Sequence, residues 1–240
     1  MKNGTIITIE NLAKRFPVGG GEFTALSNIN LSFEKGEFAG FVGPSGSGKT
    51  TLLNIIGSLD SPTEGITNVI GTTSKAMNPK KAAVLRKKHI GFIFQTYNLM
   101  PVYTVYENVE FPLLLLKMSV SERKKAVLEA LEWVGLSPKI KSKPPQLSGG
   151  ESQRVAIARA MVKKPELVLA DEPTANLDAE NSHHILQTME KLNRELETTF
   201  IFATHDEKVI GYLHRIIHLF DGEVASDEWK TEKVQGHDLI

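Results

Sequence analysis

The residues with the clearest chemical meaning form a glycine-rich run in the first quarter of the chain. Its eight positions are Gly43, Pro44, Ser45, Gly46, Ser47, Gly48, Lys49 and Thr50, and they match the pattern G-x-x-x-x-G-K-[ST] at every fixed position. Glycines let backbone N–H groups turn inward around a phosphate, and the start of the following helix adds partial positive charge. Lys49 would supply a mobile cation for the β- and γ-phosphates, and the Thr50 hydroxyl a ligand for Mg²⁺. Because an apolar strand precedes the run and a helix follows it, a phosphate-binding loop is favoured over an ordinary glycine-rich turn.

Two acidic residues follow an apolar run later in the chain. The run Leu167–Ala170 predicts a buried strand, and Asp171 and Glu172 come directly after it. Ligands of α/β sheets bind at the carboxyl ends of the strands. Asp171 fits the carboxylate of a Mg²⁺ site, and Glu172 is a candidate to accept a proton from an attacking water. An isolated Asp-Glu pair is typical of a solvated turn, but the phosphate-binding loop favours the functional interpretation.

One histidine stands at a comparable place. His205 follows the apolar run Thr199–Ala203, so it would also lie at a strand end and is a candidate contact for a γ-phosphate. A lone histidine is more often structural. We expect the other six histidines, His183, His184, His214 and His218 among them, to be surface or packing residues.

The elements that would position these residues alternate between strands and helices. Short, nearly continuous apolar runs are typical of strands buried on both faces of a parallel sheet. The expected strands are Thr5–Ile9, Ala25–Phe33, Glu37–Val42, Ile90–Phe94, Leu167–Ala170 and Thr199–Ala203, and the expected helices are Thr50–Ile56 and the segment carrying Ile185, Leu186, Met189, Leu192 and Leu196. Arg215–Phe220 and the residues after Asp221-Gly222 predict a final hairpin. This alternation predicts an α/β fold with right-handed crossovers.

The middle of the chain follows a different pattern. Thr104–Val162 shows no clear strand, and Glu122–Val134 has helical spacing. We therefore expect a helical subdomain at about 96–164, inserted into an α/β core made of residues 1–95 and 165–225. The polar residues 226–240 are expected to form a loosely attached tail.

The composition of the 240 residues disfavours several classes of protein. The 28 Lys and Arg balance the 28 Asp and Glu, so bulk electrostatic binding of nucleic acid is disfavoured. The absence of cysteine excludes a disulfide framework and a thiolate metal site. The longest apolar run, Phe111–Leu116, is far shorter than the about 20 residues that span a bilayer, and residues 1–5 show no secretory signal. We expect a soluble, cytosolic protein that cannot cross a membrane by itself.

A third segment decides between classes of phosphate-loop protein. Leu147–Glu151, with the sequence LSGGE, opens a helix for which Ser148 is a suitable cap. Taken alone, an ordinary capped helix would be the better interpretation. Followed by Gln153–Ala160, however, the segment closely resembles the signature of ATP-binding cassette (ABC) ATPases. The resemblance covers nearly the whole chain and implies a P-loop NTPase (RecA-like) core with an antiparallel β subdomain and an inserted α-helical subdomain.

Further positions match the family's motifs in the family's order. Phe16 stands where the family places an aromatic residue that stacks on adenine, and Gln95 follows a strand as the Q-loop glutamine does. Ala175–Asp178 is similar to the D-loop and Thr204–Asp206 to the H-loop. The departures are small: Glu151 replaces a more common Gln, and a Phe replaces the usual Tyr at the adenine position, which keeps the ring but loses the hydroxyl.

The resemblance implies how the chain would use ATP and Mg²⁺. Phe16 would stack on adenine, and Thr51 would join the 43–50 loop in holding the phosphates. The implied ligands around Mg²⁺, direct or through water, are Thr50, Gln95 and Asp171. The implied catalytic residues are Lys49, Gln95, Glu172 and His205, with Glu172 polarising the attacking water. Ser148 and Gly150 are implied to complete the site of a second subunit, so two ATPs would lie between the head-to-tail monomers of a homodimer or heterodimer. Gly149 and Asp178 are further implied nucleotide-binding residues.

Two segments point to a subfamily and a partner. Residues 90–101 and 107–113 resemble the ATPase subunits of lipoprotein-releasing and macrolide-efflux systems, the LolD/MacB type. We expect an ATPase on the cytoplasmic face of the inner membrane that powers export or lipid extraction through separate permease subunits, MacB/LolCE-like, and acts on no nucleic acid. The alternative is a regulatory ATPase that drives a non-transporting membrane partner, as in cell division. A simple P-loop kinase or GTPase would have no use for Leu147–Glu151.

Two surfaces remain as candidates for the partner. In the family, a membrane-subunit segment docks beside the Q-loop, and the stretch Leu99–Leu116, with Tyr97, Tyr103 and Tyr106, would line that groove, although we expect only a minority of these residues to be exposed. A basic run comprises Lys80, Lys81, Arg86, Lys87 and Lys88. A solvated helix face is the favoured interpretation of that run, and contact with anionic lipid head groups or an acidic partner loop is the alternative.

Overall fold

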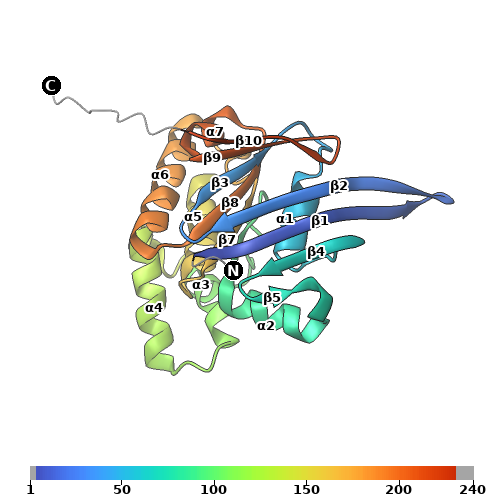
Figure 1. Cartoon of the computed structure of the whole chain (residues 1–240). Coiled ribbons are helices and arrows are strands. Elements are labelled where there is room, and N and C mark those ends of the chain that lie inside the picture. Colours follow the sequence, from blue (N-terminus) through green and yellow to red (C-terminus); the bar gives the residue numbers. More distant parts are fainter. Residues whose placement is uncertain (1–3, 231–240) are drawn as a thin grey trace.

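The computed structural model describes residues 4–230, in which two sheets and their covering helices form the body of the molecule (Figure 1). Within that range the larger sheet has six strands in the order β10-β9-β3-β8-β7-β6. The strands are β3 (Phe38–Val42), β6 (Ile90–Ile93), β7 (Leu167–Asp171), β8 (Thr199–Thr204), β9 (Arg215–Phe220) and β10 (Glu223–Trp229). Strands β6, β7, β8, β3 and β9 pair in parallel, and β10 turns back antiparallel on β9. The expected parallel sheet and final hairpin are thus both present.

The second sheet is antiparallel and has the order β2-β1-β4-β5 in the part of the chain that the structure describes. It consists of β1 (Thr5–Val18), β2 (Gly21–Glu34), β4 (Glu64–Val69) and β5 (Thr72–Thr73). The first two strands are much longer than the sequence predicts and project as a hairpin beyond the body of the molecule (Figure 1). Gly19 and Gly20, both with positive φ, form its turn. The prediction missed the outer half because apolar and polar residues do not alternate there.

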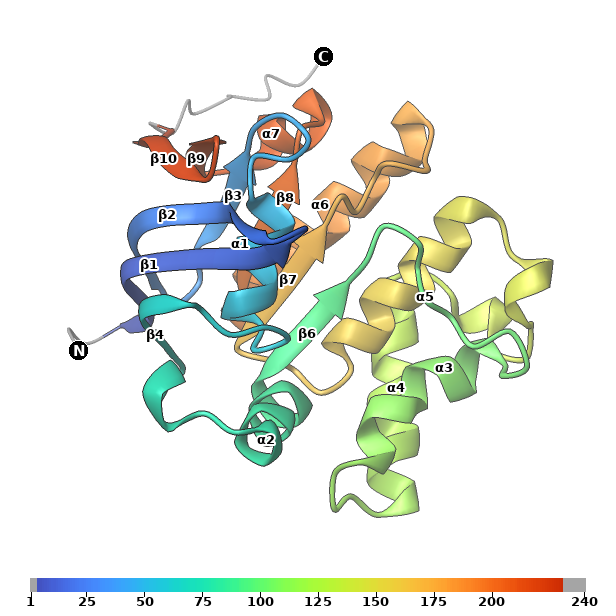
Figure 2. The ribbon, with the colours of Figure 1, turned by 90° about the vertical axis from the view of Figure 1, so that its right-hand side faces the viewer.

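Helices cover both faces of the larger sheet. Helix α1 (Lys49–Ile56) lies between the two sheets, whereas α6 (Ala179–Leu196) and α7 (Glu207–Tyr212) lie on the other side, with α2 (Pro79–His89) below the end of β6 (Figures 1 and 2). Three more helices, α3 (Val105–Leu114), α4 (Val120–Trp133) and α5 (Gly149–Met161), pack on one another beside β6 and are called the helical group below. Three short 3₁₀ turns span Ser74–Ala76, Ser137–Lys139 and Pro144–Gln146.

The larger sheet separates two apolar cores, and its pleat sends alternate side chains to each. In β8, Phe200 and Phe202 enter the core shared with the helical group and α6, whereas Ile201 and Ala203 enter the core shared with α1 and the antiparallel sheet. All five residues of β3 are buried. Each large side chain in these cores stabilises the fold by about 1.5–3 kcal/mol relative to exposure. The strand ends that carry the predicted site therefore rest on a rigid, two-sided support.

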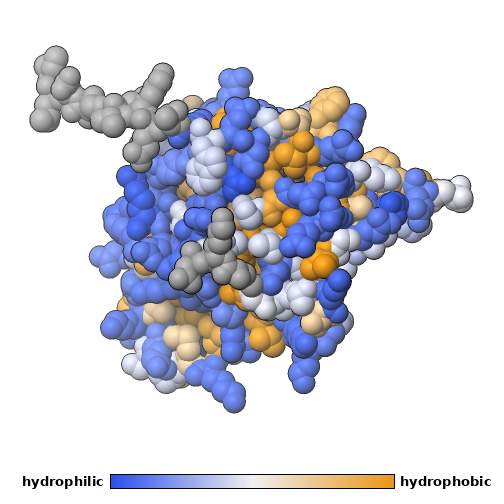
Figure 3. Space-filling model, in the orientation of Figure 1, coloured by the Kyte–Doolittle hydropathy of each residue, from blue (hydrophilic) through white to orange (hydrophobic). Residues whose placement is uncertain are grey.

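The surface is mostly hydrophilic on the face seen in Figure 3, with apolar residues showing between charged ones near its middle and bottom. Among residues 4–230, no helix is both long enough and apolar enough to cross a membrane.

Two boundaries predicted from the sequence, the start of the tail and the range of the helical subdomain, can be compared with the observed strands and helices. Strand β10 continues to Trp229, so the expectation that the tail begins at residue 226 was wrong for residues 226–229, because cross-strand pairing with β9 orders a sequence that looks polar. The rest of the expected tail, residues 231–240, lies outside the described residues. The helical group falls inside the range 96–164, and its last helix also packs on β6 and α6.

Candidate nucleotide-binding site

The glycine-rich loop joins β3 to α1 and has steric reasons for its glycines. A Cβ built on Gly43 would lie 2.1 Å from the carbonyl oxygen of Leu219, and one on Gly48 would lie 2.8 Å from that of Ala25. Gly48 also has a φ of +98°, and as the N-cap residue it places no side-chain acceptor on the first N–H groups of α1. The hydroxyl of Ser47 is buried without a hydrogen-bond partner. Free N–H groups and an unsatisfied hydroxyl make this loop a ready site for an anion.

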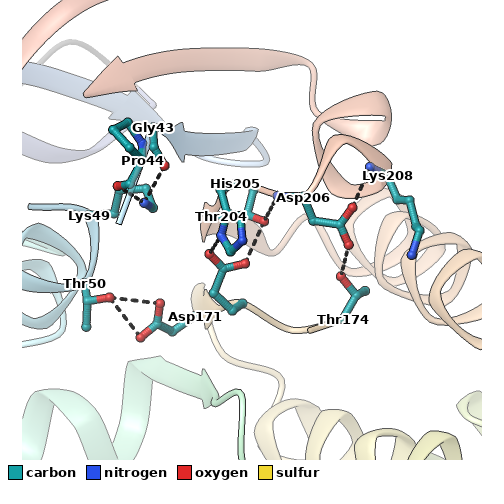
Figure 4. A network of polar contacts seen from close by, with 11 residues as sticks. Gly43, Pro44, Lys49, Thr50, Asp171, Thr174, Thr204, His205, Asp206 and Lys208 are labelled. Atoms are coloured by element: carbon teal, nitrogen blue, oxygen red, sulfur yellow. Dashed lines mark hydrogen bonds and ion pairs between the residues drawn. The ribbon is translucent and has the colours of Figure 1, made fainter. Parts of the chain in front are cut away.

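Lys49 lies over this loop rather than pointing into solvent. Its side chain is buried, and Nζ donates hydrogen bonds to the carbonyl oxygens of Gly43 at 2.6 Å and Pro44 at 2.8 Å (Figure 4). Burial lowers the pKa of Lys49, and the nearby carboxylates of Glu172 and Asp171 oppose that shift. The ammonium group is therefore partly desolvated, which strengthens its attraction for a phosphate.

The Thr50 hydroxyl faces the first predicted carboxylate. Oγ1 of Thr50 lies 3.1 Å and 3.2 Å from the two carboxylate oxygens of Asp171 (Figure 4). Burial raises the pKa of Asp171, while the hydrogen bond from Thr50 lowers it. The hydroxyl comes from the start of α1 and the carboxylate from the end of β7, two strands away from β3 in the sheet. Together they offer hard oxygen donors of the kind that Mg²⁺ prefers.

The second carboxylate is held by the end of the neighbouring strand. Oε1 of Glu172 lies 2.6 Å from Nδ1 of His205, and Oε2 accepts a hydrogen bond from the Thr204 hydroxyl at 3.0 Å. The backbone of Glu172 has a φ of +44°, and its N–H donates to the carbonyl of Ala203 at 2.9 Å. A non-glycine residue with positive φ stores strain, which is common at functional sites. The side chain of Glu172 is only 14% exposed, against 63% for His205.

The segment after β8 is braced by Thr204, Asp206 and Thr174, of which Thr174 is not among the predicted residues. The Thr204 hydroxyl accepts a hydrogen bond from the N–H of Asp206 at 3.0 Å, and the Asp206 carboxylate accepts one from the Thr174 hydroxyl at 3.1 Å. Thr174 is buried and follows β7, so these bonds tie the two strand ends together (Figure 4). The only hint of this role in the sequence was a threonine shortly after a predicted strand, and threonines in that setting are usually packing residues.

Three more predicted residues lie beside this centre. Gln95 follows β6, the strand next to β7, and its backbone carbonyl accepts a hydrogen bond from the side chain of Asn176 at 2.9 Å. Phe16 lies on the projecting hairpin opposite Phe23, and Nζ of Lys14 sits 4.8 Å from the centre of its ring. Thr51 lies half-buried in the first turn of α1. One face of the Phe16 ring is therefore covered by the ammonium group of Lys14.

The signature residues form a separate cluster at two helix starts. Ser148 caps α5 in a capping box: its Oγ accepts from the N–H of Glu151 at 3.2 Å, and the Glu151 carboxylate accepts from the N–H of Ser148 at 2.8 Å. Asp178 caps α6, and both of its carboxylate oxygens accept hydrogen bonds from Asn181. A Cβ on Gly150 would lie 2.4 Å from Oδ1 of Asn181, so α5 approaches α6 closely here. A Cβ on Gly149 would lie 3.2 Å from the hydroxyl of Tyr97.

The structure thus brings the predicted residues into two groups. The 43–50 loop, Asp171, Glu172 and His205 meet at the carboxyl ends of β3, β7 and β8 (Figure 4). Gly150 and Asp178 both lie against Asn181, whereas Gly149 lies near the Tyr97 hydroxyl and Ser148 pairs with Glu151. No hydrogen bond joins the second group to the 43–50 loop among residues 4–230.

Comparison with known proteins identifies this arrangement. Residues 26–175 match the family model described as ABC transporter. The chain belongs to the ABC transporter family. The ABC transporter ATP-binding protein MJ0796 of Methanocaldococcus jannaschii is 44% identical over 97% of this chain and 99% of its own length. The lipoprotein-releasing system ATP-binding protein LolD of Legionella pneumophila is 40% identical over 94% of this chain and 100% of its own.

Solved structures agree with these sequence relationships. A dimeric structure of the ATP-binding cassette MJ0796, in a post-hydrolysis state bound to ADP and Pi, matches with a TM-score of 0.86 and 43% identity, covering 93% of this chain and 98% of that one. CbiO1 of Clostridium perfringens, part of the ABC transporter complex cbiONQ, matches with a TM-score of 0.84 and 29% identity, covering 94% of this chain and 88% of that one. The predictions of an ABC ATPase fold and of an ATPase are confirmed for this ABC chain. The roles of its individual site residues stay predictions.

Proposed function

We propose that this chain is the ATP-binding and ATP-hydrolysing subunit of a membrane ABC transporter, and that its LolD-like sequence reflects work on lipoproteins or similar lipid-linked cargo. The observation that carries the enzymatic part is that the phosphate-binding loop after β3 meets Asp171 and Glu172 at the end of β7. The relationship to LolD, at 40% identity over nearly the full length of both chains, supports the cellular part.

The residues at the loop fit an ATP-bound Mg²⁺ ion. Thr50 and Asp171 already face each other at 3.1 Å, and Gln95 lies at the end of the neighbouring strand β6. One carboxylate and one hydroxyl leave coordination positions for phosphate oxygens and water, as Mg²⁺ requires. When bound there, Mg²⁺ would neutralise charge on the β- and γ-phosphate oxygens.

The remaining residues act on the phosphates and on water. N–H groups of the 43–50 loop and the ammonium of Lys49 bind the phosphate oxygens, which frees Lys49 from the carbonyls of Gly43 and Pro44. Glu172 accepts a proton from the water that attacks the γ-phosphorus as the bond from that phosphorus to the ADP oxygen breaks. Thr204 holds one oxygen of Glu172, so the other is free for the water once His205 turns toward the γ-phosphate. Catalysis here rests on positioning and charge neutralisation.

A second copy or a related subunit completes each site. The signature residues Ser148, Gly149 and Gly150 start a helix whose N–H groups suit a phosphate, yet no hydrogen bond in residues 4–230 joins them to the 43–50 loop of their own chain. In a head-to-tail dimer they would face the loop of the partner. The dimeric structures of MJ0796, at 43% identity, support this arrangement.

A membrane subunit supplies the transport path. No helix in residues 4–230 can span a bilayer, and LolD, by its name, belongs to a lipoprotein-releasing system. We place the chain on the cytoplasmic face of the inner membrane, held there by its permease. The partner segment would dock in a groove beside β6, next to Gln95, so that movement at the nucleotide reaches the membrane.

Hydrolysis by the purified chain tests the enzymatic proposal. Replacing Glu172 with Gln removes the proton acceptor but keeps the side-chain size, and general-base catalysis contributes roughly 10²–10⁴-fold. We expect phosphate release from Mg·ATP to fall by about that factor, with ATP binding retained. Unchanged hydrolysis by Glu172→Gln would exclude Glu172 as the base.

Recovery from membranes tests the transport proposal. The tagged chain is expressed in its own host, solubilised with detergent and purified with its partners. We expect a permease with membrane spans and a large extracytoplasmic domain. Recovery of no membrane protein would contradict the transporter assignment while leaving the ATPase intact.

A further inference from the structure

The peptide that follows Glu172 is held by Gln153, a buried residue early in α5. Pro173 and Thr174 come directly after Glu172, and both are buried. Nε2 of Gln153 donates a hydrogen bond to the carbonyl oxygen of Pro173 at 2.6 Å. Within residues 4–230 that carbonyl accepts no other hydrogen bond. A single amide therefore links α5 to the chain just past the end of β7.

The backbone of Glu172 needs support of this kind. Its φ of +44° is uncommon for a residue other than glycine, and the proline that follows restricts its conformation further. Strained residues persist only where the surrounding structure holds them in several ways. The N–H of Glu172 donates to the carbonyl of Ala203 at 2.9 Å, and Gln153 fixes the carbonyl of the next residue. The direction of the Glu172 side chain therefore depends on both bonds.

Packing alone does not account for the amide of Gln153. The side chain is fully buried, and its Oε1 has no hydrogen-bond partner within residues 4–230. Because a carbonyl can only accept, the amide nitrogen must face Pro173 and the amide oxygen must face away. A leucine or methionine would fill a similar volume without burying an unsatisfied oxygen. What those side chains cannot provide is the hydrogen bond to Pro173.

Helix α5 is a rigid anchor for that hydrogen bond. Its start is fixed by the capping box of Ser148 and Glu151, and Val155 and Ile157 on the same helix are fully buried in the core. The helix lies between β6 and the other two helices of the helical group (Figure 2). Side chains on packed helices can hold their neighbours to within about 0.5 Å, which is the precision that catalytic groups need.

We propose that Gln153 is a positioning residue for the ATPase reaction: through the carbonyl of Pro173 it fixes the backbone of Glu172, and with it the direction in which the carboxylate meets the attacking water. This inference rests on the proposed function, in which Glu172 is the proton acceptor. Gln153 has its effect through Glu172 and not through a contact with ATP. The bond from Thr174 to Asp206 holds the same segment to the end of β8.

ATP hydrolysis by the full-length chain measures the effect of the amide. Gln153→Leu keeps most of the bulk of the side chain and removes the donor. We expect kcat to fall about tenfold to a hundredfold, because a shift of about 1 Å at a reacting group can cost roughly 10² in rate. KM for ATP should change less than about twofold, since the 43–50 loop is untouched. An unchanged kcat in the folded variant would overturn the proposal.

A double variant shows whether Gln153 acts through Glu172. Once the carboxylate is gone its alignment no longer matters, so Gln153→Leu should slow hydrolysis no further in a Glu172→Gln background. Single-turnover hydrolysis, with the protein in excess over radiolabelled ATP, measures such slow rates. If the two losses multiply instead, Gln153 supports the site in a general way and the proposal is wrong.

A matched control lies next to Gln153 on the same helix. Ser152 is also buried, but its side chain forms no hydrogen bond to the 172–174 segment within residues 4–230. Ser152→Ala should keep the kcat of the wild type. If Ser152→Ala lowers kcat as much as Gln153→Leu does, any change in this part of α5 slows the enzyme, and the hydrogen bond to Pro173 is not the cause.

Glu172→Gln alone separates this inference from the proposed function. If that variant hydrolyses ATP at the wild-type rate, Glu172 is not the base and both proposals fail. If it is slow while Gln153→Leu is as fast as the wild type, only the further inference is refuted. Thermal unfolding of each variant detects loss of folded protein. Should Gln153→Leu fail to fold, Gln153→Met takes its place, because the unbranched methionine side chain adapts to irregular spaces.

Discussion

At the scale of single residues, the site depends on two kinds of position. At some, a larger side chain would not fit; at others, a different side chain would lose a specific hydrogen bond. Glu172 is held by Thr204 and His205 in a strained backbone conformation, so its carboxylate has one geometry in this state. Lys49 is bonded to carbonyls of its own loop. In the proposed mechanism, a bound phosphate takes the Lys49 ammonium and the His205 ring away from these partners.

The turn into α1 gives a residue-scale prediction. Gly48 has positive φ, and a Cβ there would lie 2.8 Å from the carbonyl oxygen of Ala25. We expect Gly48→Ala to lower the free energy of unfolding by about 1–3 kcal/mol and to weaken ATP binding, because the loop must shift. Denaturant unfolding and nucleotide titration measure the two effects. The matched control is Gly211→Ala, where no atom lies within 4 Å of the added Cβ, and equal stability of the two variants would contradict the steric argument.

At the scale of elements, the helical group begins each of its helices in the same way. Thr104 with Glu107, Ser119 with Glu122, and Ser148 with Glu151 form three capping boxes. Glu151, where the family more often has Gln, therefore has a structural role in this chain. The signature helix is positioned by the same local chemistry as its two neighbours.

The capping boxes predict a pH dependence. Hydrogen bonds from Thr104, Ser119 and Ser148 lower the pKa values of Glu107, Glu122 and Glu151 below the ordinary value. A carboxylate with a lowered pKa in the folded state contributes stability above its unfolded pKa, near 4.3, and loses it as the pH falls further through the folded pKa. We expect the thermal midpoint to drop on acidification below about pH 4.3, and to drop less in the variant with all three changed to Gln.

A control on α4 isolates the cause. Glu132 is exposed on the same helix as Glu122 but belongs to no capping box. Glu132→Gln should leave the acid dependence of the midpoint as in the wild type. If it flattened that dependence as much as Glu122→Gln does, bulk charge and not capping would be responsible.

At the scale of the whole molecule, one buried arginine joins the two sheets. Arg215 at the start of β9 pairs with Glu37 at 2.9 Å and with Asp227 at 2.6 Å, and it donates to the carbonyl of Ser32. Its guanidinium lies 4.9 Å from the ring centre of Phe33 and 5.2 Å from that of Trp229. Because Glu37 is buried, with burial raising its pKa, the network depends on every charge being present.

The corrected end of the fold follows from this network. A chain of residues 1–225 lacks Asp227 and Trp229, so Arg215 loses one ion pair and one aromatic cover. We expect it to be less stable than a chain of residues 1–230 by about 2 kcal/mol or more, measured by denaturant unfolding. The point variant Asp227→Asn in the full chain should show part of the same loss, and equal midpoints for residues 1–225 and 1–230 would refute the role of β10.

Dimerisation is the second prediction at this scale. In a Glu172→Gln background, ATP should convert monomers into dimers that size-exclusion chromatography with light scattering detects. Ser148→Arg should abolish the dimer. Ser148→Asp should abolish it too, since Asp keeps the cap of α5 but places a negative charge where the partner's phosphates would lie. A dimer that survives Ser148→Asp would contradict the assignment of this helix start to the partner's ATP.

Motifs of contiguous residues were enough to predict the candidate site residues. Each motif is recognised from neighbouring residues in the sequence: the loop 43–50, the pair Asp171-Glu172 and the segment Leu147–Glu151. Apolar runs predicted the strands that precede the first two. The long hairpin was missed because its outer half pairs without an apolar face, and β10 was ended four residues early because its order comes from β9 and Arg215.

The sequence by itself determined the family, the parallel core and the residues expected to meet ATP, because each rests on neighbours along the chain. The tertiary structure alone decided which side chains meet across strand ends, such as Glu172 with His205, and that Gly150 on α5 packs against Asn181 on α6. It also decided that Gln153 on α5 reaches the carbonyl of Pro173. Such contacts join residues far apart in sequence, so they exist only once crossovers and packing have brought those segments together.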